Sequence, residues 1–331
     1  MSTVYITRED SGLYKKGERL IVKQGKKKVG DIPLVKVDQV VVFGDASISG
    51  ALISLLLKAN VPISYLSYYG KYKGRLVPEY SKNSLLRIEQ FKACNDDAFC
   101  LKFAKRIVEG KLTNMRTLVM RDTRGDRSKE VDRVLDKMKY MIEKVDSGDC
   151  IDVVRGYEGI GSRYYFSIFN SVLSDEFEFK KRTRRPPKDP INCLLSFGYT
   201  LLLNDVLAAL YLVGFDPYIG CFHSNQYGKP SLALDLMEEF RPVIVDSVIK
   251  TMVNKGMIGQ DGFENKYGTV NMKDKVRNLF LEQYEQRLRT EFTHPIFKYK
   301  VNWRRCLELQ ARLLSKVMMG EIEEYPPLVV R

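Results

Sequence analysis

One histidine and three acidic residues stand at positions where they could form a metal site. His223 is one of two histidines in the chain and follows a long apolar segment, residues 191–215. Asp235 and Glu238 are three residues apart, so they share one face if their segment is helical. Asp235 stands among apolar residues, where a carboxylate is costly unless it is paired or bound to a cation. We therefore expect His223, Asp235 and Glu238 to converge if residues 224–230 fold back.

Glu158 is the third acid, and it lies between glycines where an aromatic helix over residues 159–174 is predicted to begin. One interpretation is an acid that complements the helix dipole, a preference worth about 0.3–1 kcal/mol. The other is an oxygen ligand at the mouth of a helical core. One histidine with two or three carboxylates forms a hard site, which suits Mn²⁺ or Mg²⁺ better than structural zinc. Glu239 and Arg241 are then expected to be solvated.

The chain is strongly basic, with 54 Lys and Arg against 41 Asp and Glu and a net charge of +13. Such a surface attracts polyanions, of which nucleic acid and an anionic membrane are the usual candidates. Two basic stretches, residues 180–188 and residues 102–127 with Lys111, are either solvated faces or phosphate contacts. Their position around a candidate metal site favours DNA or RNA phosphates. The expected DNA-contacting residues are Lys180, Lys181, Arg182, Arg184, Arg185, Lys188, Arg163 and Lys229.

Residues 191–215 are long and apolar enough to cross a bilayer. However, Asn204 and Asp205 lie in the middle, and an aspartate there costs about 2.5–3.5 kcal/mol. A helix buried inside the protein is the better interpretation, and no membrane partner is expected. The six cysteines form no C-x-x-C pair and the chain begins without a signal-peptide pattern, so we expect buried, reduced cysteines and a cytoplasmic protein.

The chain changes character near residue 85. Before it, short β-rich runs alternate with glycine-containing turns, and one helix follows Ser49 and ends before Pro62. After it, apolar residues recur at three- and four-residue spacing and strand-like runs are almost absent. We predict an α+β protein with a small β-sandwich-like domain over residues 1–85 and a larger all-α domain over residues 86–331. The predicted helices of the second domain cover residues 85–93, 98–109, 114–121, 131–147, 159–174, 192–213, 232–252, 272–289 and 297–318.

Four segments between residues 155 and 246 resemble the signature blocks of one family, the CRISPR-associated endonuclease and integrase of spacer acquisition. The N-terminal half is similar to this family in layout, with a β domain that leads into a single helix. Phe215 stands where the family usually has leucine, which is an apolar replacement. The four segments are Arg-Gly-Tyr-Glu-Gly at 155–159, Arg-Arg-Pro-Pro-Lys-Asp-Pro-Ile-Asn at 184–192, residues 214–223, and Leu-Ala-Leu-Asp-Leu-Met-Glu-Glu-Phe-Arg-Pro with Val-Ile-Val-Asp at 232–246.

The resemblance implies roles and partners. It implies that Glu158, His223 and Glu238 are catalytic metal ligands for Mn²⁺ or Mg²⁺, with Asp235 as an additional acid beside the metal. It also implies a homodimer paired through the β domains, in the cytoplasm of a prokaryote. The implied partners are double-stranded DNA, both protospacer and CRISPR leader–repeat, and a small ferredoxin-like subunit of CRISPR adaptation.

The activity that the resemblance implies is metal-dependent DNA integration. A 3′-hydroxyl of incoming protospacer DNA attacks a phosphodiester at the leader–repeat end, and attack by water instead gives endonuclease activity. Because one phosphodiester replaces another, no ATP is needed, and the sequence holds no G-x-x-x-x-G-K-[ST] motif. Two alternatives remain: a non-catalytic DNA-binding subunit, or a generic metal-dependent nuclease that does not integrate.

Overall fold

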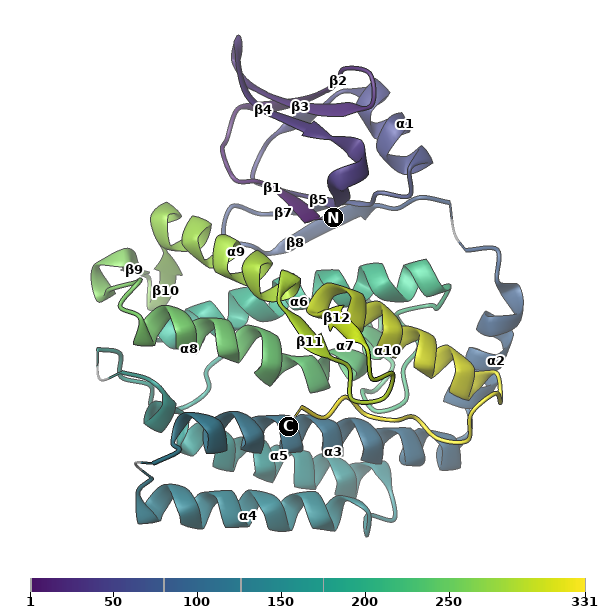
Figure 1. Cartoon of the computed structure of the whole chain (residues 1–331), viewed down its shortest axis with the longest axis vertical. Helices are drawn as coiled ribbons and strands as arrows, with labels where there is room; N and C mark the ends of the chain where they lie inside the picture. Colours follow the sequence, from purple (N-terminus) through teal and green to yellow (C-terminus); the bar gives the residue numbers. More distant parts are fainter. Residues whose placement is uncertain (1, 80, 126, 175, 331) are drawn as a thin grey trace. The chain divides into compact units, whose positions relative to one another are not determined.

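A computed structural model describes residues 2–79, 81–125, 127–174 and 176–330. The chain divides into two compact units, residues 1–80 and 81–331 (Figure 1). A β-sheet unit followed by a larger helical unit confirms the predicted α+β class. The sequence placed the change at residue 85, whereas the units divide before the first helix of the second unit, which begins at Ser84.

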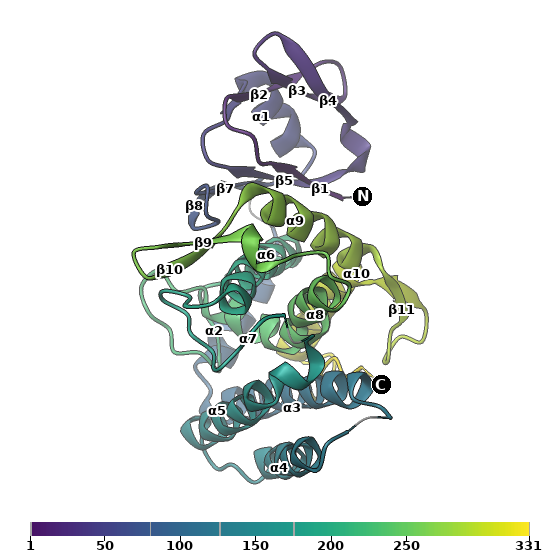
Figure 2. The same cartoon turned by 90° about the vertical axis from the view of Figure 1, so that its left-hand side faces the viewer.

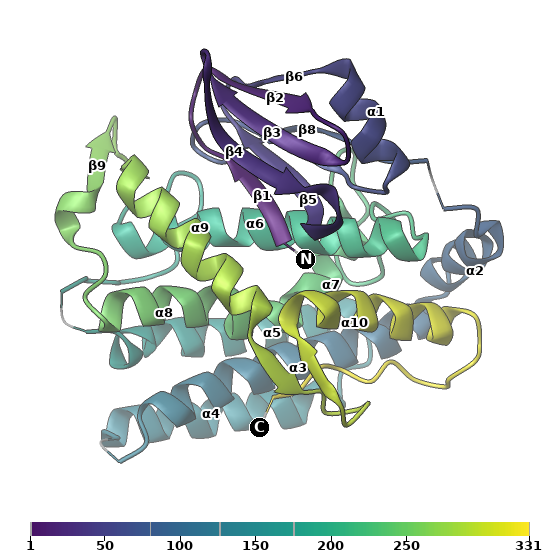
Figure 3. The same cartoon turned by 45° about the horizontal axis from the view of Figure 1, so that its top comes forward.

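Within residues 2–79 the first unit contains two four-stranded sheets. The strands are β1 (Ser2–Ile6), β2 (Ser11–Lys15), β3 (Arg19–Gln24), β4 (Lys27–Pro33), β5 (Val37–Phe43), β6 (Ser47–Ile48), β7 (Ile63–Leu66) and β8 (Tyr72–Leu76). One sheet has the order β1-β5-β7-β8, in which β8 alone runs antiparallel to its neighbour. The other has the order β4-β3-β2-β6 and is visible beside the helix of this unit in Figure 3. The predicted β-rich runs, residues 3–7, 19–23, 31–35, 39–44 and 62–66, overlap β1, β3, β4, β5 and β7. Strand β2 was not predicted, because Gly12 fits the expected turn pattern.

The two sheets and α1 (Gly50–Lys58) enclose the core of this unit. Ser49 caps α1 as predicted, since its hydroxyl accepts the amide of Leu52. The helix connects β5 to the parallel strand β7, the kind of crossover that parallel strands require. The fully buried members of the core come from both sheets and the helix: Leu13, Leu20, Val40, Val42, Leu52, Leu56 and Ile63.

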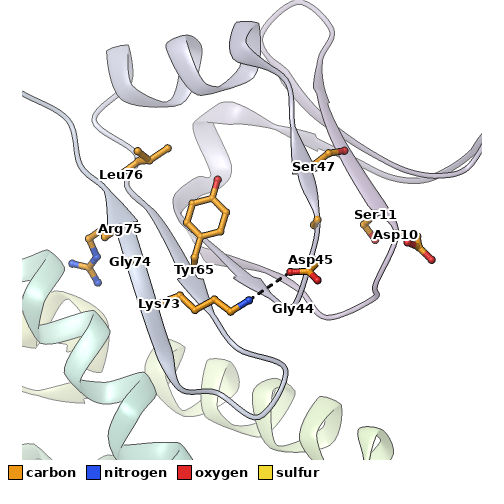
Figure 4. Close-up of a pocket in the computed structure, with 11 residues that line it drawn as sticks. Asp10, Ser11, Gly44, Asp45, Ser47, Tyr65, Lys73, Gly74, Arg75 and Leu76 are labelled. Carbon is orange, nitrogen blue, oxygen red and sulfur yellow. Dashed lines mark hydrogen bonds and ion pairs between the residues drawn. The ribbon is translucent and has the colours of Figure 1, made fainter.

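An open hollow of about 930 Å³ lies on the β unit, lined by residues of β8 and of the segment 44–47 (Figure 4). Asp10 and Asp45 contribute carboxylates to its lining, and Lys73 and Arg75 contribute cations. Nζ of Lys73 lies 3.5 Å from Oδ1 of Asp45. The lining therefore combines charges of both signs.

The second unit is mainly helical. Its helices are α2 (Ser84–Cys94), α3 (Asp97–Asp122), α4 (Lys129–Val145), α5 (Ile151–Ser167), α6 (Pro190–Val213), α7 (Ser231–Met237), α8 (Ser247–Asn254), α9 (Asp274–Arg289) and α10 (Trp303–Met318). Helices α3, α4 and α5 pack against one another and form one layer (Figures 1 and 2). Helix α6 packs against α7 and α10.

Two helices extend further than the sequence predicted. α3 continues through Gly110, where two shorter helices were predicted. This glycine allows a close approach, since a Cβ there would lie 2.9 Å from Cβ of Pro327. α5 begins at Ile151 rather than near residue 159, so Glu158 lies inside a helix.

Other elements differ from the predicted all-α pattern. The helix predicted over residues 232–252 is instead α7, a 3₁₀ turn (Glu238–Phe240), a π-helical turn (Arg241–Asp246) and α8. Pro242 lacks the amide hydrogen that a regular helix would use there. Two hairpins were not predicted: β9 (Phe263–Lys266) with β10 (Thr269–Met272), and β11 (Glu291–Thr293) with β12 (Lys300–Asn302).

Helix α6 is a core helix, as predicted. It begins after the N-cap Asp189 and ends at Gly214, which has a φ of 112°. Asp205, in its middle, is 5% exposed and is paired with Tyr284, whose hydroxyl donates at 2.6 Å, and with Arg304 at 3.2 Å. α6 is long and apolar enough to cross a membrane, but 78% of its most apolar window is buried inside the protein.

The cysteines agree only in part with the prediction that all six are buried. Cys100, Cys193, Cys221 and Cys306 are buried, whereas Cys94 is half-buried and Cys150 is exposed.

Substitutions at a buried and an exposed leucine of α6 test whether this helix is buried as described. Leu202 is 0% exposed and Leu212 is 57% exposed. We expect Leu202→Ala to lower the free energy of unfolding by about 2–5 kcal/mol through lost transfer energy and a residual cavity. Leu212→Ala should change it by less than about 0.5 kcal/mol. The single tryptophan, Trp303, is buried in the helical unit, so its fluorescence during urea denaturation follows this unit. Equal losses in the two variants would contradict the burial of α6.

Candidate functional site

Lys111 of α3 is the residue around which the predicted ligands gather. Its Nζ makes an ion pair with Oε1 of Glu158 and lies 2.7 Å from Oε2 of Glu238. The side chains of Lys111 and Glu238 are each 6% exposed. The prediction that Lys111 belongs to a solvated or DNA-contacting basic stretch is therefore wrong, because its ammonium group is buried between two carboxylates.

Glu158 reaches this point from the middle of α5. The interpretation as an N-terminal acid that complements the helix dipole is wrong, because Ile151 begins the helix seven residues earlier. Ser162 lies one turn further along the same face and donates its hydroxyl to Oε1 of Glu158 at 2.8 Å. Glu158 thus lies on the face of α5 that is turned toward α3.

Opposite charges keep both glutamates ionised. Burial alone would raise the pKa of Glu238, but Arg241 and Lys111 outweigh it and lower that pKa to about 2. Burial would also raise the pKa of Glu158, but Lys111 together with the Ser162 hydroxyl lowers it below the ordinary value. Burial would lower the pKa of Lys111, but the two glutamates raise it. The site is therefore charged at neutral pH.

Asp235 holds His223 in one orientation. Oδ1 of Asp235 lies 2.7 Å from Nδ1 of His223 and accepts the backbone amide of the same residue at 2.8 Å. Oδ2 accepts the amides of Cys221 and Phe222 at 2.9 and 3.0 Å. A Cβ at Gly220 would lie 2.7 Å from Oδ2, so the glycine makes this approach possible. Because Asp235 accepts at Nδ1, the neutral imidazole presents the lone pair of Nε2 on its other side.

The structure thus places Glu158 and Glu238 against Lys111, His223 beside Glu238, and Asp235 behind the histidine. Nε2 of His223 lies 3.9 Å from Oε1 of Glu238. Asp235 is fully buried and uses both oxygens within the loop, so it positions the histidine and is not aimed at a shared ion. Two ionised carboxylates and an imidazole lone pair fit Mn²⁺ or Mg²⁺ by donor type. In this arrangement, with Lys111 between the glutamates, no group of three or more His, Cys, Asp and Glu side chains among the described residues is placed so that it could hold a metal ion.

A buried network lies behind Glu238. Nε of Arg241 is 3.0 Å from Oε2 of Glu238, and the guanidinium stacks 4.5 Å from the ring centre of Tyr199. The hydroxyls of Tyr199 and Tyr165 donate to Asp246 at 2.8 and 2.9 Å. Arg241 and Asp246 begin and end the π-helical turn, and such turns are frequent at functional sites. The expectation that Arg241 is solvated is wrong, since its side chain is 13% exposed and packed.

Glu239 is buried as well, and the expectation that it is solvated is also wrong. Its Oε1 accepts the hydroxyl of Tyr325 at 2.5 Å, and its Oε2 accepts the amide of Leu328 at 2.7 Å. Burial raises the pKa of Glu239 to about 7. Asn114 donates to the carbonyls of Glu239 and Leu328 at 2.9 and 2.8 Å. No sequence signal identified residues 325–330 as the support behind the site.

Most of the predicted DNA-contacting residues are exposed, but Arg182 and Lys229 are half-buried. Arg182 is half-buried, donates to Asn192 at 2.8 Å and to Ser196 at 3.1 Å, and stacks on Tyr199, so its guanidinium holds the loop in place. Lys229 is half-buried and its Nζ lies 3.3 Å from Oγ of Ser224. The exposed members of the predicted set are Lys180, Lys181, Arg184, Arg185, Lys188 and Arg163.

The sequence has clear relatives. A family model described as CRISPR associated protein Cas1 matches residues 4–286. The chain is 35% identical over 333 residues to a CRISPR-associated endonuclease Cas1 of Thermus thermophilus, covering 100% of this chain and 98% of that protein. It is 36% identical over 336 residues to a CRISPR-associated exonuclease Cas4/endonuclease Cas1 fusion of Geobacter sulfurreducens. That alignment covers 99% of this chain but 60% of the fusion protein.

Solved structures share the fold. The structure of a Cas1 protein from Thermotoga maritima matches with a TM-score of 0.84 at 27% identity, covering 97% of both chains. A chain of a Cas6-RT-Cas1–Cas2 complex also matches with a TM-score of 0.84, at 26% identity. This match covers 99% of the present chain and 36% of that one.

Asp246 makes stability depend on pH. Burial raises its pKa from the ordinary 3.8 to about 6, although the two tyrosine hydroxyls act in the opposite direction. Between these values the folded state keeps a proton that the unfolded chain has lost, so stability falls as the pH rises from about 4 to 6. Asp246→Asn removes this contribution. Urea denaturation followed by Trp303 fluorescence should show the wild type losing stability relative to the variant across this range, and parallel curves would contradict the assignment.

Proposed function

Because the chain belongs to the Cas1 family of CRISPR-associated proteins, we propose that it is the metal-dependent DNA endonuclease and integrase of CRISPR adaptation. It inserts protospacer DNA into the CRISPR array at the leader–repeat end. The observation that carries this proposal is that Glu158 and Glu238, from separate segments, both contact Lys111, and that Nε2 of His223 lies 3.9 Å from Glu238.

The proposed reaction is a transesterification at phosphorus. The 3′-oxygen of the protospacer forms a bond to the phosphorus of the target strand, and the bond from that phosphorus to the original 3′-oxygen breaks. The attacking hydroxyl loses a proton and the departing oxygen gains one, so bonds and charge balance without ATP. Water in place of the 3′-hydroxyl gives hydrolysis, which is the endonuclease activity.

Mn²⁺ or Mg²⁺ is the cofactor that we propose, held by Glu158, Glu238 and Nε2 of His223. When bound, such an ion polarises the phosphoryl oxygen and stabilises charge on the reacting oxygens. Asp235 accepts a hydrogen bond from Nδ1 of His223 and thereby keeps the Nε2 lone pair turned toward Glu238. Arg241 keeps Glu238 ionised and therefore available as an oxygen ligand.

Double-stranded DNA is the proposed substrate, and the exposed cations of residues 180–188 are its proposed contacts. Lys180, Lys181, Arg184, Arg185 and Lys188 are exposed on one loop. Arg182 secures this loop to α6 and Tyr199, which also stacks on Arg241 beside Glu238. The loop is thus connected by packing to the site at which phosphodiesters would react.

Assembly is proposed to involve a second copy and a small adaptation subunit. Among the described residues, β1 and β8 are the edge strands of one sheet and β4 and β6 those of the other, and pairing of two β units would cover such edges. Insertion of a duplex needs one strand transfer on each strand, which two symmetric sites supply. The similarity to a chain of a Cas6-RT-Cas1–Cas2 complex supports a Cas partner, for which we propose a ferredoxin-like fold.

Removing a proposed ligand should abolish strand joining. We expect Glu158→Ala, His223→Ala and Glu238→Ala each to stop covalent joining of a pre-trimmed duplex to a supercoiled repeat plasmid in Mn²⁺, while duplex binding stays largely intact. Glu143→Ala, which removes an exposed acid of α4, is the matched control. Retained joining by His223→Ala at low Mn²⁺ would overturn its role. Wild-type protein that only nicks would favour a generic nuclease, and one that only binds would favour a non-catalytic subunit.

The cationic loop should govern the salt dependence of DNA binding. We expect neutralising Arg184 and Arg185 together to weaken binding to all sequences alike. The slope of log K against log salt should fall by about 0.9 for each lost phosphate contact. Fluorescence anisotropy across a salt series measures this, with the exposed Lys139→Gln of α4 as a control. An unchanged slope for the double variant would mean that the loop is only solvated.

The assembly should be a stable dimer in solution. We expect a mass near twice 38.2 kDa by light scattering, with residues 1–85 forming most of the contact. A persistent monomer at micromolar concentration would refute it. Hydrogen exchange locates the contact, because protection within residues 1–85 should decrease when dilution separates the subunits. If dilution lowers protection only within residues 86–331, the protein is a dimer but its contact is not formed by residues 1–85.

A further inference from the structure

The proposed metal site already contains a positive charge that belongs to the protein. The Lys111 ammonium contacts Glu158 and lies 2.7 Å from Glu238, so it interacts with both carboxylates of the site. Arg241 does not bridge the two carboxylates, because its guanidinium is stacked on Tyr199 and its ion pair is with Glu238. Lys111 is thus the cation that joins the two proposed oxygen ligands.

We propose that Lys111 is a resident counter-cation, which holds Glu158 and Glu238 together without metal and competes with a divalent cation for them. This inference rests on the proposed function, since it assumes that both carboxylates bind the ion. An ammonium group and a divalent ion close to the same oxygens repel each other. Metal binding therefore requires the ammonium group to move away.

The charge balance supports displacement. The carboxylates of Glu158 and Glu238 face Lys111 and Arg241, and Asp235 adds one more carboxylate behind His223, so the five charges sum to −1. A divalent ion added beside Lys111 would bring this sum to +1 in a largely buried place, whereas departure of the ammonium group would bring it to zero. Buried charge without compensation is costly, so the state with the ammonium displaced is favoured.

The backbone around Lys111 is fixed, so the side chain is what moves. Gly110 lies against Pro327, and Asn114, one turn after Lys111, bonds to the carbonyls of Glu239 and Leu328. The flexible four-carbon stem of a lysine allows its ammonium group to leave while α3 stays in place.

The test compares Mn²⁺ binding by the full-length wild type and by Lys111→Met, which keeps an unbranched side chain and removes the charge. Electron paramagnetic resonance of free Mn²⁺ gives the dissociation constant without an activity assay. If the ammonium occupies the site nine-tenths of the time, its removal tightens binding by about tenfold. Lys102→Met, which removes an exposed cation from the same helix, should leave the constant unchanged.

Thermal unfolding provides the second measurement. Without metal, Lys111→Met leaves two carboxylates facing each other, so it should melt below the wild type in chelator and gain more from Mn²⁺. Lys111→Gln, which is also uncharged but polar, should show the same pattern. This variant replaces Lys111→Met in both measurements if the methionine variant folds only with Mn²⁺.

The outcomes separate this inference from the proposed function. Equal or weaker Mn²⁺ binding by both variants, with binding by the wild type intact, overturns the counter-cation while leaving the metal site in place. Failure of the wild type and both variants to bind Mn²⁺ refutes the metal site and this inference with it. Binding by the variants alone supports the competition.

Discussion

Two carboxylates buried at one point require positive charge beside them, and the helical unit is organised around this requirement. Glu158 comes from α5 and Glu238 from the turn after α7, and an isolated buried carboxylate would lose its hydration without compensation. Lys111 from α3 and Arg241 supply the compensating charge. The helices are therefore joined at the site by ion pairs as well as by apolar packing, and their relative placement fixes the ligand geometry.

The same charges are connected to the surface. Arg241 and Arg182 both stack on Tyr199, at 4.5 and 5.6 Å from its ring centre. Tyr199 in turn bonds to Asp246, which Tyr165 of α5 also contacts. This arrangement links the cationic loop, α6, α5 and the π-helical turn, so a loop proposed to bind phosphates and a carboxylate proposed to bind metal share one packed support.

Neighbouring acids in this region have different partners. Glu238 faces the site, while Glu239, the next residue, binds Tyr325 and Leu328 near the end of the chain. Asp235 accepts hydrogen bonds from three backbone amides of the loop and orients His223. These three acids lie within five residues of a nearly helical path, and their side chains have different partners. One short segment thereby supplies a proposed ligand, a positioning group and an anchor for the C-terminal residues.

The sequence by itself determined the β-to-α order and the burial of α6, and it offered Glu158, His223, Asp235 and Glu238 as candidate site residues, because apolar spacing and local residue patterns can be read along the chain. The resemblance added the roles of Glu158, His223 and Glu238, which remain proposals. Only the tertiary structure decided that Lys111, 47 residues before Glu158, lies between the two glutamates, and that Glu239 and Arg241 are buried. It also decided that Asp235 bonds to the loop of His223 and that Arg182 turns inward. These facts depend on contacts between segments far apart in sequence, and a charged residue looks the same in a sequence whether it meets water or a buried partner.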